Sequence, residues 1–181
     1  MIEQAFGWVG DLVRWVAQFV PRWVILDTTE GAVKFVRGSN PVALGPGIHW
    51  YWPMMTTFQS YPTARQADNL RAQTIVTEDD KVIAVGGMLV YEVADIEKLL
   101  AHTHNASTTV TDIALTAVHD VCCQLSWDAL KTEQRKGTLD TKLKNTAQKA
   151  LVEYGVKVIK LMLTDLAPCR VLKLMQSTSQ E

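Results

Sequence analysis

The stretch TIVTEDDKVIAVGGMLVYEVADIEKL, residues 74–99, decides the fold of this 181-residue chain. Two apolar runs flank Asp79-Asp80, which is the pattern of a β-hairpin. Because both faces are apolar from Val82 to Val93, we expect that strand to be covered on both sides or to lie in a sheet against helices. Gly86-Gly87 in its middle indicates a bulge or a close approach of another backbone. Asp95 suits the N-cap of a helix that follows.

The residues before this stretch predict further strands joined by turns. WVILDTTEGAVKFVRG, residues 23–38, predicts two short strands around a turn at Glu30-Gly31, and TTFQSYPT, residues 56–63, predicts another strand. Between them lie two turn dipeptides, Asn40-Pro41 and Pro46-Gly47, of which the second suits the central positions of a type II turn. The first half of the chain is therefore expected to be rich in β-structure.

The residues after the stretch predict three helices and a closing strand. Ser107 or Thr108 can begin one helix and Ser126 the next, and Gly137 separates the second from the third. The third helix would share one face among Leu139, Leu143, Ala147, Ala150, Leu151 and Tyr154.

Gly155 suits the left-handed end of that third helix, and residues 156–166 then alternate as a strand, which Pro168 ends. The order of elements predicts an α+β fold.

The first 23 residues, MIEQAFGWVGDLVRWVAQFVPRW, predict an amphipathic helix with a wide apolar face. Its narrow polar stripe carries Asp11 and Arg14, and Pro21 would end it. We expect its apolar side chains to contact a membrane, namely Phe6, Trp8, Val9, Leu12, Trp15, Val16, Phe19 and, just beyond the helix, Trp23.

Three placements of this segment are open. Residues 2–20 would measure about 28 Å as a helix, nearly enough to span a bilayer. Spanning would put Asp11 and Arg14 near the midplane, at a cost of roughly 2.5–3.5 kcal/mol each. Lying in the plane of one leaflet avoids that cost, so we favour it over spanning. The third placement is a core helix of a soluble domain.

The aromatic stretch LGPGIHWYWPMM, residues 44–55, lacks the glycine pattern of a phosphate-binding loop. On a strand Trp50 and Trp52 would share one face, and His49 and Tyr51 the other. Core packing of the first subdomain and a tryptophan rim at the membrane interface are both simpler explanations than an aromatic cage.

Composition and motifs argue against catalysis and nucleic-acid binding. The 18 Lys and Arg nearly balance the 19 Asp and Glu, so no basic footprint for nucleic acid is present. The cysteines Cys122, Cys123 and Cys169 make a poor disulfide framework and favour a reducing compartment. His119, Asp120 and Cys122 would point to different sides of one helix. We therefore expect no catalytic residue, no metal ligand and no cofactor.

The ordered set of these motifs resembles the SPFH or Band 7 superfamily of stomatins, prohibitins and flotillins. The resemblance runs from about Thr28 to Leu166. It includes a turn element at Pro46, Gly47 and Pro53, then the hairpin, long strand and Asp95-capped helix of residues 74–99. It ends with an aromatic-Gly-Val strand, here Tyr154, Gly155, Val156, Val158, Asp165 and Leu166.

The resemblance implies an N-terminal membrane helix over residues 1–23, a β-rich first subdomain over 24–93, a second subdomain of helices and a strand over 94–168, and a short tail over 169–181. It implies a membrane-associated scaffold without catalysis that forms homo-oligomeric rings or cages and organises a membrane patch or regulates a membrane protease or channel. The alternative is an adaptor, monomeric or a small oligomer, that binds one such partner. The cysteines, taken as reduced thiols, favour the cytoplasmic face. The residues after Pro168 are too few for the family's coiled coil, so a cage with helical walls is not expected.

Overall fold

The computed structural model describes residues 10–12, 15–16 and 19–169. The chain forms two compact units. Among the described residues, unit 1 comprises those up to 65 together with 92–106 and 153–157, and unit 2 comprises 66–91, 107–152 and 158–169. Each unit is thus assembled from segments distant in the sequence, and does not follow the contiguous ranges 24–93 and 94–168 expected for the subdomains.

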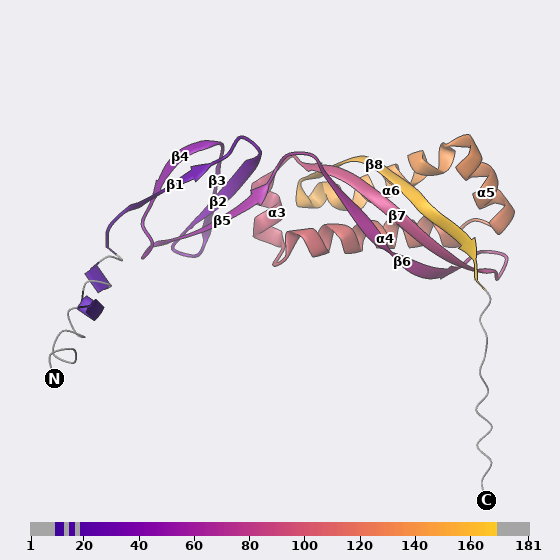
Figure 1. The fold of residues 1–181 in the computed structure, drawn as a ribbon, viewed down its shortest axis with the longest axis horizontal. Helices are drawn as coiled ribbons and strands as arrows, with labels where there is room; N and C mark the ends of the chain where they lie inside the picture. The colour runs from indigo at the N-terminus through magenta and orange to yellow at the C-terminus, as the bar shows by residue number, and fades with distance from the viewer. Residues whose placement is uncertain (1–9, 13–14, 17–18, 170–181) are drawn as a thin grey trace, which may run out of the picture. The chain divides into compact units, whose positions relative to one another are not determined.

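Beyond the partly described N-terminal helix, the described residues of unit 1 form two small antiparallel sheets and one further helix (Figure 1). In the first sheet two strands pair, β1 (Arg22–Leu26) and β4 (Gly47–Tyr51). In the second sheet β2 lies between β3 and β5, with bounds β2 (Glu30–Val36), β3 (Asn40–Leu44) and β5 (Thr56–Pro62). Helix α3 spans Ile96–His102.

The turn expected at Glu30-Gly31 is wrong, because both residues lie inside β2. The chain turns earlier, where the Glu30 N–H donates to the Asp27 carbonyl oxygen at 3.1 Å. Gly31 serves packing: a Cβ there would lie 2.8 Å from Cγ2 of Thr63 and 3.0 Å from Cδ1 of Ile96. A glycine that permits close approach and a glycine that permits a turn look alike in one sequence.

The turn expected at Asn40-Pro41 is also displaced, because these residues begin β3. The reversal lies at 37–39, where Arg37 and Gly38 have positive φ angles of 54° and 74°. Pro41 is tolerated because β3 is an edge strand of its sheet. The chain bends at Pro46 between β3 and β4, near the place expected, but Gly47 is the first residue of β4 and its φ of 133° departs from the roughly +80° of a type II turn.

Helix α3 begins as expected. The Asp95 side chain accepts a hydrogen bond from the Lys98 N–H at 3.2 Å, and Asp95 itself is extended with φ −135°. Gly155, with φ +70°, accepts hydrogen bonds at its carbonyl oxygen from the N–H groups of Ala94 and Asp95. These bonds tie the start of α3 to the segment that precedes the last strand.

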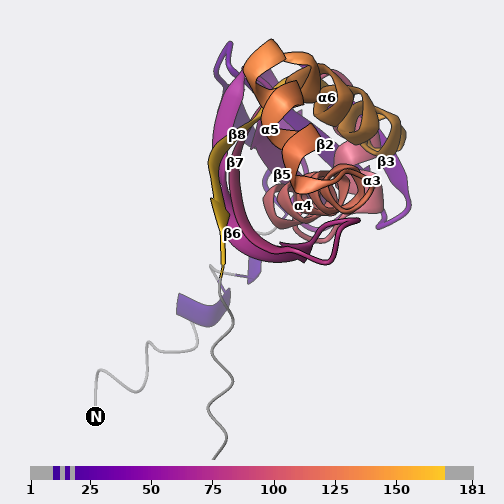
Figure 2. The same ribbon diagram turned by 90° about the vertical axis from the view of Figure 1, so that its right-hand side faces the viewer.

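Unit 2 is a three-stranded sheet in the order β6-β7-β8, with helices on one face (Figure 2). Its strands are β6 (Gln66–Val76), β7 (Val82–Val93) and β8 (Val156–Pro168). Its helices are α4 (Ala106–Cys123), α5 (Trp127–Lys136) and α6 (Thr138–Leu151), followed by the 3₁₀ turn η1 (Val152–Tyr154). The expected α+β class is therefore confirmed.

The long strand β7 buries one face fully and the other only partly. Its buried side chains alternate as Ile83, Val85, Leu89, Tyr91 and Val93. Those of the opposite face, Val82, Ala84, Met88, Val90 and Glu92, are half-buried. Of the two expectations for this strand, the sheet packed against helices on one face is the one observed.

Gly86 and Gly87 lie where β8 leaves little room for a side chain on β7. A Cβ on Gly86 would lie 2.9 Å from Oδ2 of Asp165, and one on Gly87 would lie 3.0 Å from the Met162 carbonyl oxygen, both on β8. The β6–β7 register also shifts between Leu70 and Gln73, opposite Gly86. The close approach and the irregularity predicted here are both confirmed.

The helix boundaries of unit 2 follow the predicted capping residues. The Ser126 side chain accepts from the Ala129 N–H at 3.4 Å, and Gly137 adopts the left-handed conformation between α5 and α6 with φ +72°. Helix α4 begins at Ala106, slightly before the expected Ser107 or Thr108. Of the predicted face of α6, Ala150 is exposed, and the members that are buried are Leu139, Leu143, Ala147 and Leu151.

Candidate membrane-contact site

The two-stranded sheet of unit 1 carries its largest apolar side chains on an exposed face. The register of β1 and β4 places Trp23 opposite Trp50 and Ile25 opposite Ile48. These four side chains are 69%, 59%, 70% and 65% exposed, in that order. Their neighbours on the other face, such as Val24 and His49, are half-buried. The strands therefore alternate in the usual way, but with bulky apolar residues toward solvent.

The exposed apolar surface continues past the end of β4. Trp52, Met54 and Met55 are at least half exposed in the turn that leads to β5. The Trp52 carbonyl oxygen holds this turn together by accepting from the N–H groups of Met55 and Thr56 at 3.0 and 2.9 Å. We call the whole surface the apolar tip, which consists of Trp23, Ile25, Ile48, Trp50, Trp52, Met54 and Met55.

The two paired indoles of the tip line a shallow groove. The ring centroids of Trp23 and Trp50 are 5.6 Å apart with an interplanar angle of 55°. Together with Pro21 and Arg22 these indoles line an open groove of about 440 Å³. Exposed contiguous apolar surface on a small domain marks a site of protein or membrane contact, because solvating it is unfavourable.

The expected shared face of Trp50 and Trp52 agrees with the exposure pattern, since His49 and Tyr51 between and beside them are half-buried. Core packing is wrong for both tryptophans, because each is at least 50% exposed. The sequence could not decide this, because the same alternation occurs whether the apolar face is covered or open. Pro53 lies in the same turn, between Trp52 and Met54.

The N-terminal segment is described only in part. Residues 10–12 and 15–16 are helical, and Leu12, Trp15, Val16 and Phe19 are exposed. The Trp15 and Phe19 rings meet edge to face, with centroids 4.9 Å apart. Phe6, Trp8 and Val9 lie outside the described residues, so the helix expected over residues 2–20 stays a prediction. Within the described ranges, no helix has the length and apolar character needed to cross a bilayer.

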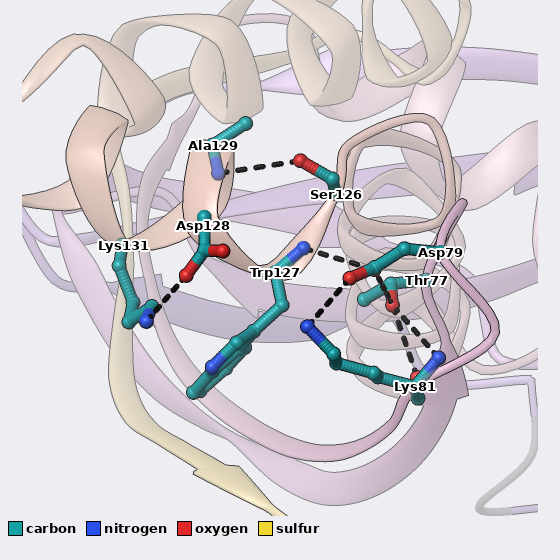
Figure 3. Close-up of polar contacts among 8 residues, drawn as sticks. All are labelled: Thr77, Asp79, Lys81, Ser126, Trp127, Asp128, Ala129 and Lys131. Atoms are coloured by element: carbon teal, nitrogen blue, oxygen red, sulfur yellow. Dashed lines mark hydrogen bonds and ion pairs between the residues drawn. The ribbon is translucent and has the colours of Figure 1, made fainter.

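A polar cluster in unit 2 has a structural role that the sequence did not reveal (Figure 3). The Asp79 carboxylate accepts hydrogen bonds from Thr77 Oγ1 at 2.6 Å and the Trp127 N–H at 3.0 Å, and pairs with Lys81 Nζ at 2.8 Å. The hydrogen bond from Lys81, with those from Thr77 and Trp127, holds the pKa of Asp79 far below its usual range. Asp79 was expected only to form the hairpin turn; it also satisfies the first N–H of α5.

His119 of α4 lies near Cys123 and Asp120, but not in the geometry of a catalytic triad. His119 Nδ1 lies 3.9 Å from Cys123 Sγ, one helical turn away, and 3.7 Å from Asp120 Oδ1. A triad needs the carboxylate and the nucleophile on different ring nitrogens, whereas here both face Nδ1. Cys122 is buried, and burial raises the pKa of its thiol to about 11. No metal-binding group of three or more acidic, His or Cys side chains occurs among the described residues.

Comparisons with known proteins agree with the fold. Residues 23–180 match the family described as SPFH domain / Band 7 family. Two archaeal proteins, both uncharacterized, are similar to the chain. One, from Archaeoglobus fulgidus, is 23% identical over 158 residues, which is 87% of this chain and 63% of the relative. The other, from Methanocaldococcus jannaschii, is 21% identical over 145 residues, which is 80% of this chain and 72% of the relative.

This chain thus spans somewhat less than two thirds of the length of the first relative. The family match covers all the described strands and helices except the start of β1 and the partial N-terminal helix. The chain belongs to the SPFH domain / Band 7 family, whose members are generally membrane-associated and non-enzymatic.

Proposed function

We propose that this chain is a non-enzymatic scaffold that attaches to one leaflet of a membrane through its apolar tip and N-terminal segment. The observation that carries the proposal is the exposure of three tryptophans, two isoleucines and two methionines on one part of unit 1. Tryptophan is favoured at the membrane interface because the indole has an apolar body and a polar N–H.

The strand pairing of the tip limits how deeply it can insert. β1 and β4 pair with one another over five residue pairs, but both are edges of a two-stranded sheet, so the exposed side chains and not the strands would enter the apolar layer. Fully burying one aliphatic side chain such as Ile25 contributes about 1.5–3 kcal/mol. A few such side chains give weak, reversible attachment for one copy.

Assembly would turn weak attachment into stable attachment, because many anchors on one ring bind with avidity. The sheet of unit 2 supports assembly, since β6 and β8 are its edge strands and edge strands can pair with another chain. We therefore propose a homo-oligomeric ring or cage that organises a membrane patch or regulates a membrane protease or channel. The three free cysteines favour the cytoplasmic face, where thiols stay reduced.

Vesicle co-sedimentation tests the attachment. We expect the wild type to pellet with vesicles and Trp23→Glu/Trp50→Glu to lose most of this binding, because two carboxylates would enter the interface. The matched control is Val76→Glu/Val152→Glu, which adds the same charge at two exposed apolar residues of unit 2. Equal binding by the double tryptophan variant and the wild type would disprove attachment through the tip.

Electron microscopy of the protein on vesicles tests the assembly. Discrete rings or cages are the expected result. Monodisperse monomers that still bind vesicles would contradict the scaffold and favour an adaptor that binds a single membrane partner.

A further inference from the structure

The charges of unit 1 are segregated along its strands. Three cations, which we call the cationic rim, lie at the end that carries the tryptophans: Arg22, Lys34 and Arg37. Arg22 pairs with Tyr51 in the β1–β4 register, next to Trp23. Lys34 Nζ donates to the Trp50 carbonyl oxygen at 3.5 Å. The Arg37 N–H donates to the Met55 carbonyl oxygen at 2.8 Å, which places the exposed Arg37 beside the methionines.

The acidic residues of the same strands lie at the other end. Asp27 directly follows Leu26, which pairs with Gly47 at the far end of the β1–β4 sheet. Glu30 begins β2 opposite Pro62, whereas Arg37 follows the last residue of that strand. Between residues 20 and 62 these five are the charged side chains, so the cations lie toward the tryptophan and methionine part of the tip and the acids toward the end near Ile25 and Ile48.

The cationic rim is not neutralised within the part of the chain that the structure describes. None of its three side chains belongs to the ion pairs of these residues, which involve other cations. Arg22 also lines the groove between the indoles of Trp23 and Trp50. A guanidinium there can bind a phosphate oxygen pair while the neighbouring rings occupy the level of the lipid backbone.

We propose that the apolar tip and the cationic rim together select an anionic lipid surface over a zwitterionic one. This inference rests on the proposed membrane attachment and adds the class of lipid to it. The apolar side chains supply attachment to any bilayer, whereas the rim supplies attraction that depends on the surface charge of the leaflet. Each cation near an anionic leaflet strengthens binding about fivefold at physiological salt or below, and the rim contains three.

The test compares the full chain on vesicles of pure phosphatidylcholine with vesicles containing about a third phosphatidylglycerol. The charge variant is Arg22→Gln/Lys34→Gln/Arg37→Asn, where asparagine suits the positive φ of residue 37. Its matched control is Lys136→Gln/Lys144→Gln/Lys149→Gln, which removes the same charge from exposed positions of unit 2. Partition coefficients are measured by co-sedimentation at low and high salt.

The expected result is stronger binding of the wild type and the control to the anionic vesicles, weakened by salt because exposed charges are screened. The charge variant should lose on the order of 100-fold on anionic vesicles and bind phosphatidylcholine as the wild type does. Equal wild-type binding to both vesicles, or equal losses by the charge variant and the control, would overturn the lipid selectivity alone. Failure of the wild type to bind either vesicle would overturn the proposed function as well. Should the rim instead serve an acidic protein partner, the charge variant would match the wild type on anionic vesicles, which also overturns the inference.

Discussion

The sheet of unit 2 and the β1–β4 sheet of unit 1 both contain strands in which every second side chain is apolar. The apolar face is buried in unit 2 and exposed in unit 1. In unit 2 the alternate residues of β7, such as Leu89 and Tyr91, are fully buried, and helices cover one face of the sheet (Figure 2). In unit 1 the alternate residues of β1 and β4, such as Ile25 and Trp50, are more than half exposed. Periodicity therefore shows which side chains share a face, but only the covering elements decide whether that face becomes core or binding surface.

The change in the free energy of unfolding on substitution should therefore differ between the two regions. Where helices cover the sheet, an apolar side chain stabilises the fold; where solvent covers it, the same kind of side chain contributes little to folding and is available for binding. Pairs of variants, one in each setting, test this division.

The largest effect should follow truncation of a buried leucine of unit 2. Leu143 in α6 is 0% exposed, so Leu143→Ala should lower the free energy of unfolding by about 2–5 kcal/mol through lost burial and a cavity. Ile25→Thr, at a 70% exposed position of the tip, should change it by no more than about 0.5 kcal/mol. Urea unfolding followed by circular dichroism measures both. A comparable loss for Ile25→Thr would mean that the tip is packed in solution.

The next largest effect should come from replacing one of two glycines that adopt the left-handed backbone conformation. Gly155 and Gly137 have φ angles of 70° and 72°, yet a Cβ on Gly155 would lie 2.4 Å from the Asp95 carbonyl oxygen while Gly137 faces open space. Gly137→Ala should cost about 1–2 kcal/mol for the backbone conformation alone. Gly155→Ala should cost clearly more, because the contact that joins α3 to the last strand must shift. Equal midpoints in urea would contradict the close approach at Asp95.

The smallest effect concerns the polar cluster of unit 2 and depends on pH. The hydrogen bonds from Lys81, Thr77 and Trp127 depress the pKa of Asp79 in the folded state, relative to about 3.9 in an unfolded chain. The stabilisation by Asp79 is therefore complete above about pH 4 and is lost as pH falls toward the folded-state pKa.

Asp79→Asn should accordingly lower the melting temperature at pH 7, and the gap to the wild type should narrow as the pH is lowered through about 4. Thermal unfolding at pH 7, 5 and 3 provides the measurement, with Asp80→Asn at the same turn as control. A gap that is constant with pH would show that Asp79 acts by shape and not by charge.

Local chemistry explains what the sequence predicted well. Asp95, Ser126 and Gly137 each mark a helix boundary, because capping depends on one side chain and the few backbone groups next to it. The hairpin at Asp79-Asp80 was predictable for the same reason, since Asp80 has the positive φ of 55° that such turns use. Gly155 does not end the third helix as predicted, because α6 ends at Leu151 and Gly155 follows the 3₁₀ turn instead.

Non-local chemistry explains what it did not predict. The pairing of β1 with β4 joins residues about 25 positions apart, so nothing near Trp23 indicates that it faces Trp50. Gly31 suggested a turn because its close neighbours, Thr63 and Ile96, are distant in sequence. The cationic rim could not be predicted from the composition, in which positive and negative charges nearly balance. The grouping of its three cations depends on which strand ends come together in the fold.

Tryptophan fluorescence on vesicles tests the central claim most directly, because it compares the membrane contact of the apolar tip with that of unit 2 under the same conditions. Two variants retain a single tryptophan each, Trp50 in the tip or Trp127 in α5, with phenylalanine at the other tryptophan positions. Vesicles containing phosphatidylglycerol carry lipids brominated along the acyl chains, which quench only nearby indoles, and circular dichroism confirms folding. Strong quenching of Trp50 with little change for Trp127 is the predicted result. Bound protein in which Trp50 is quenched no more than Trp127 would contradict membrane attachment through the tip.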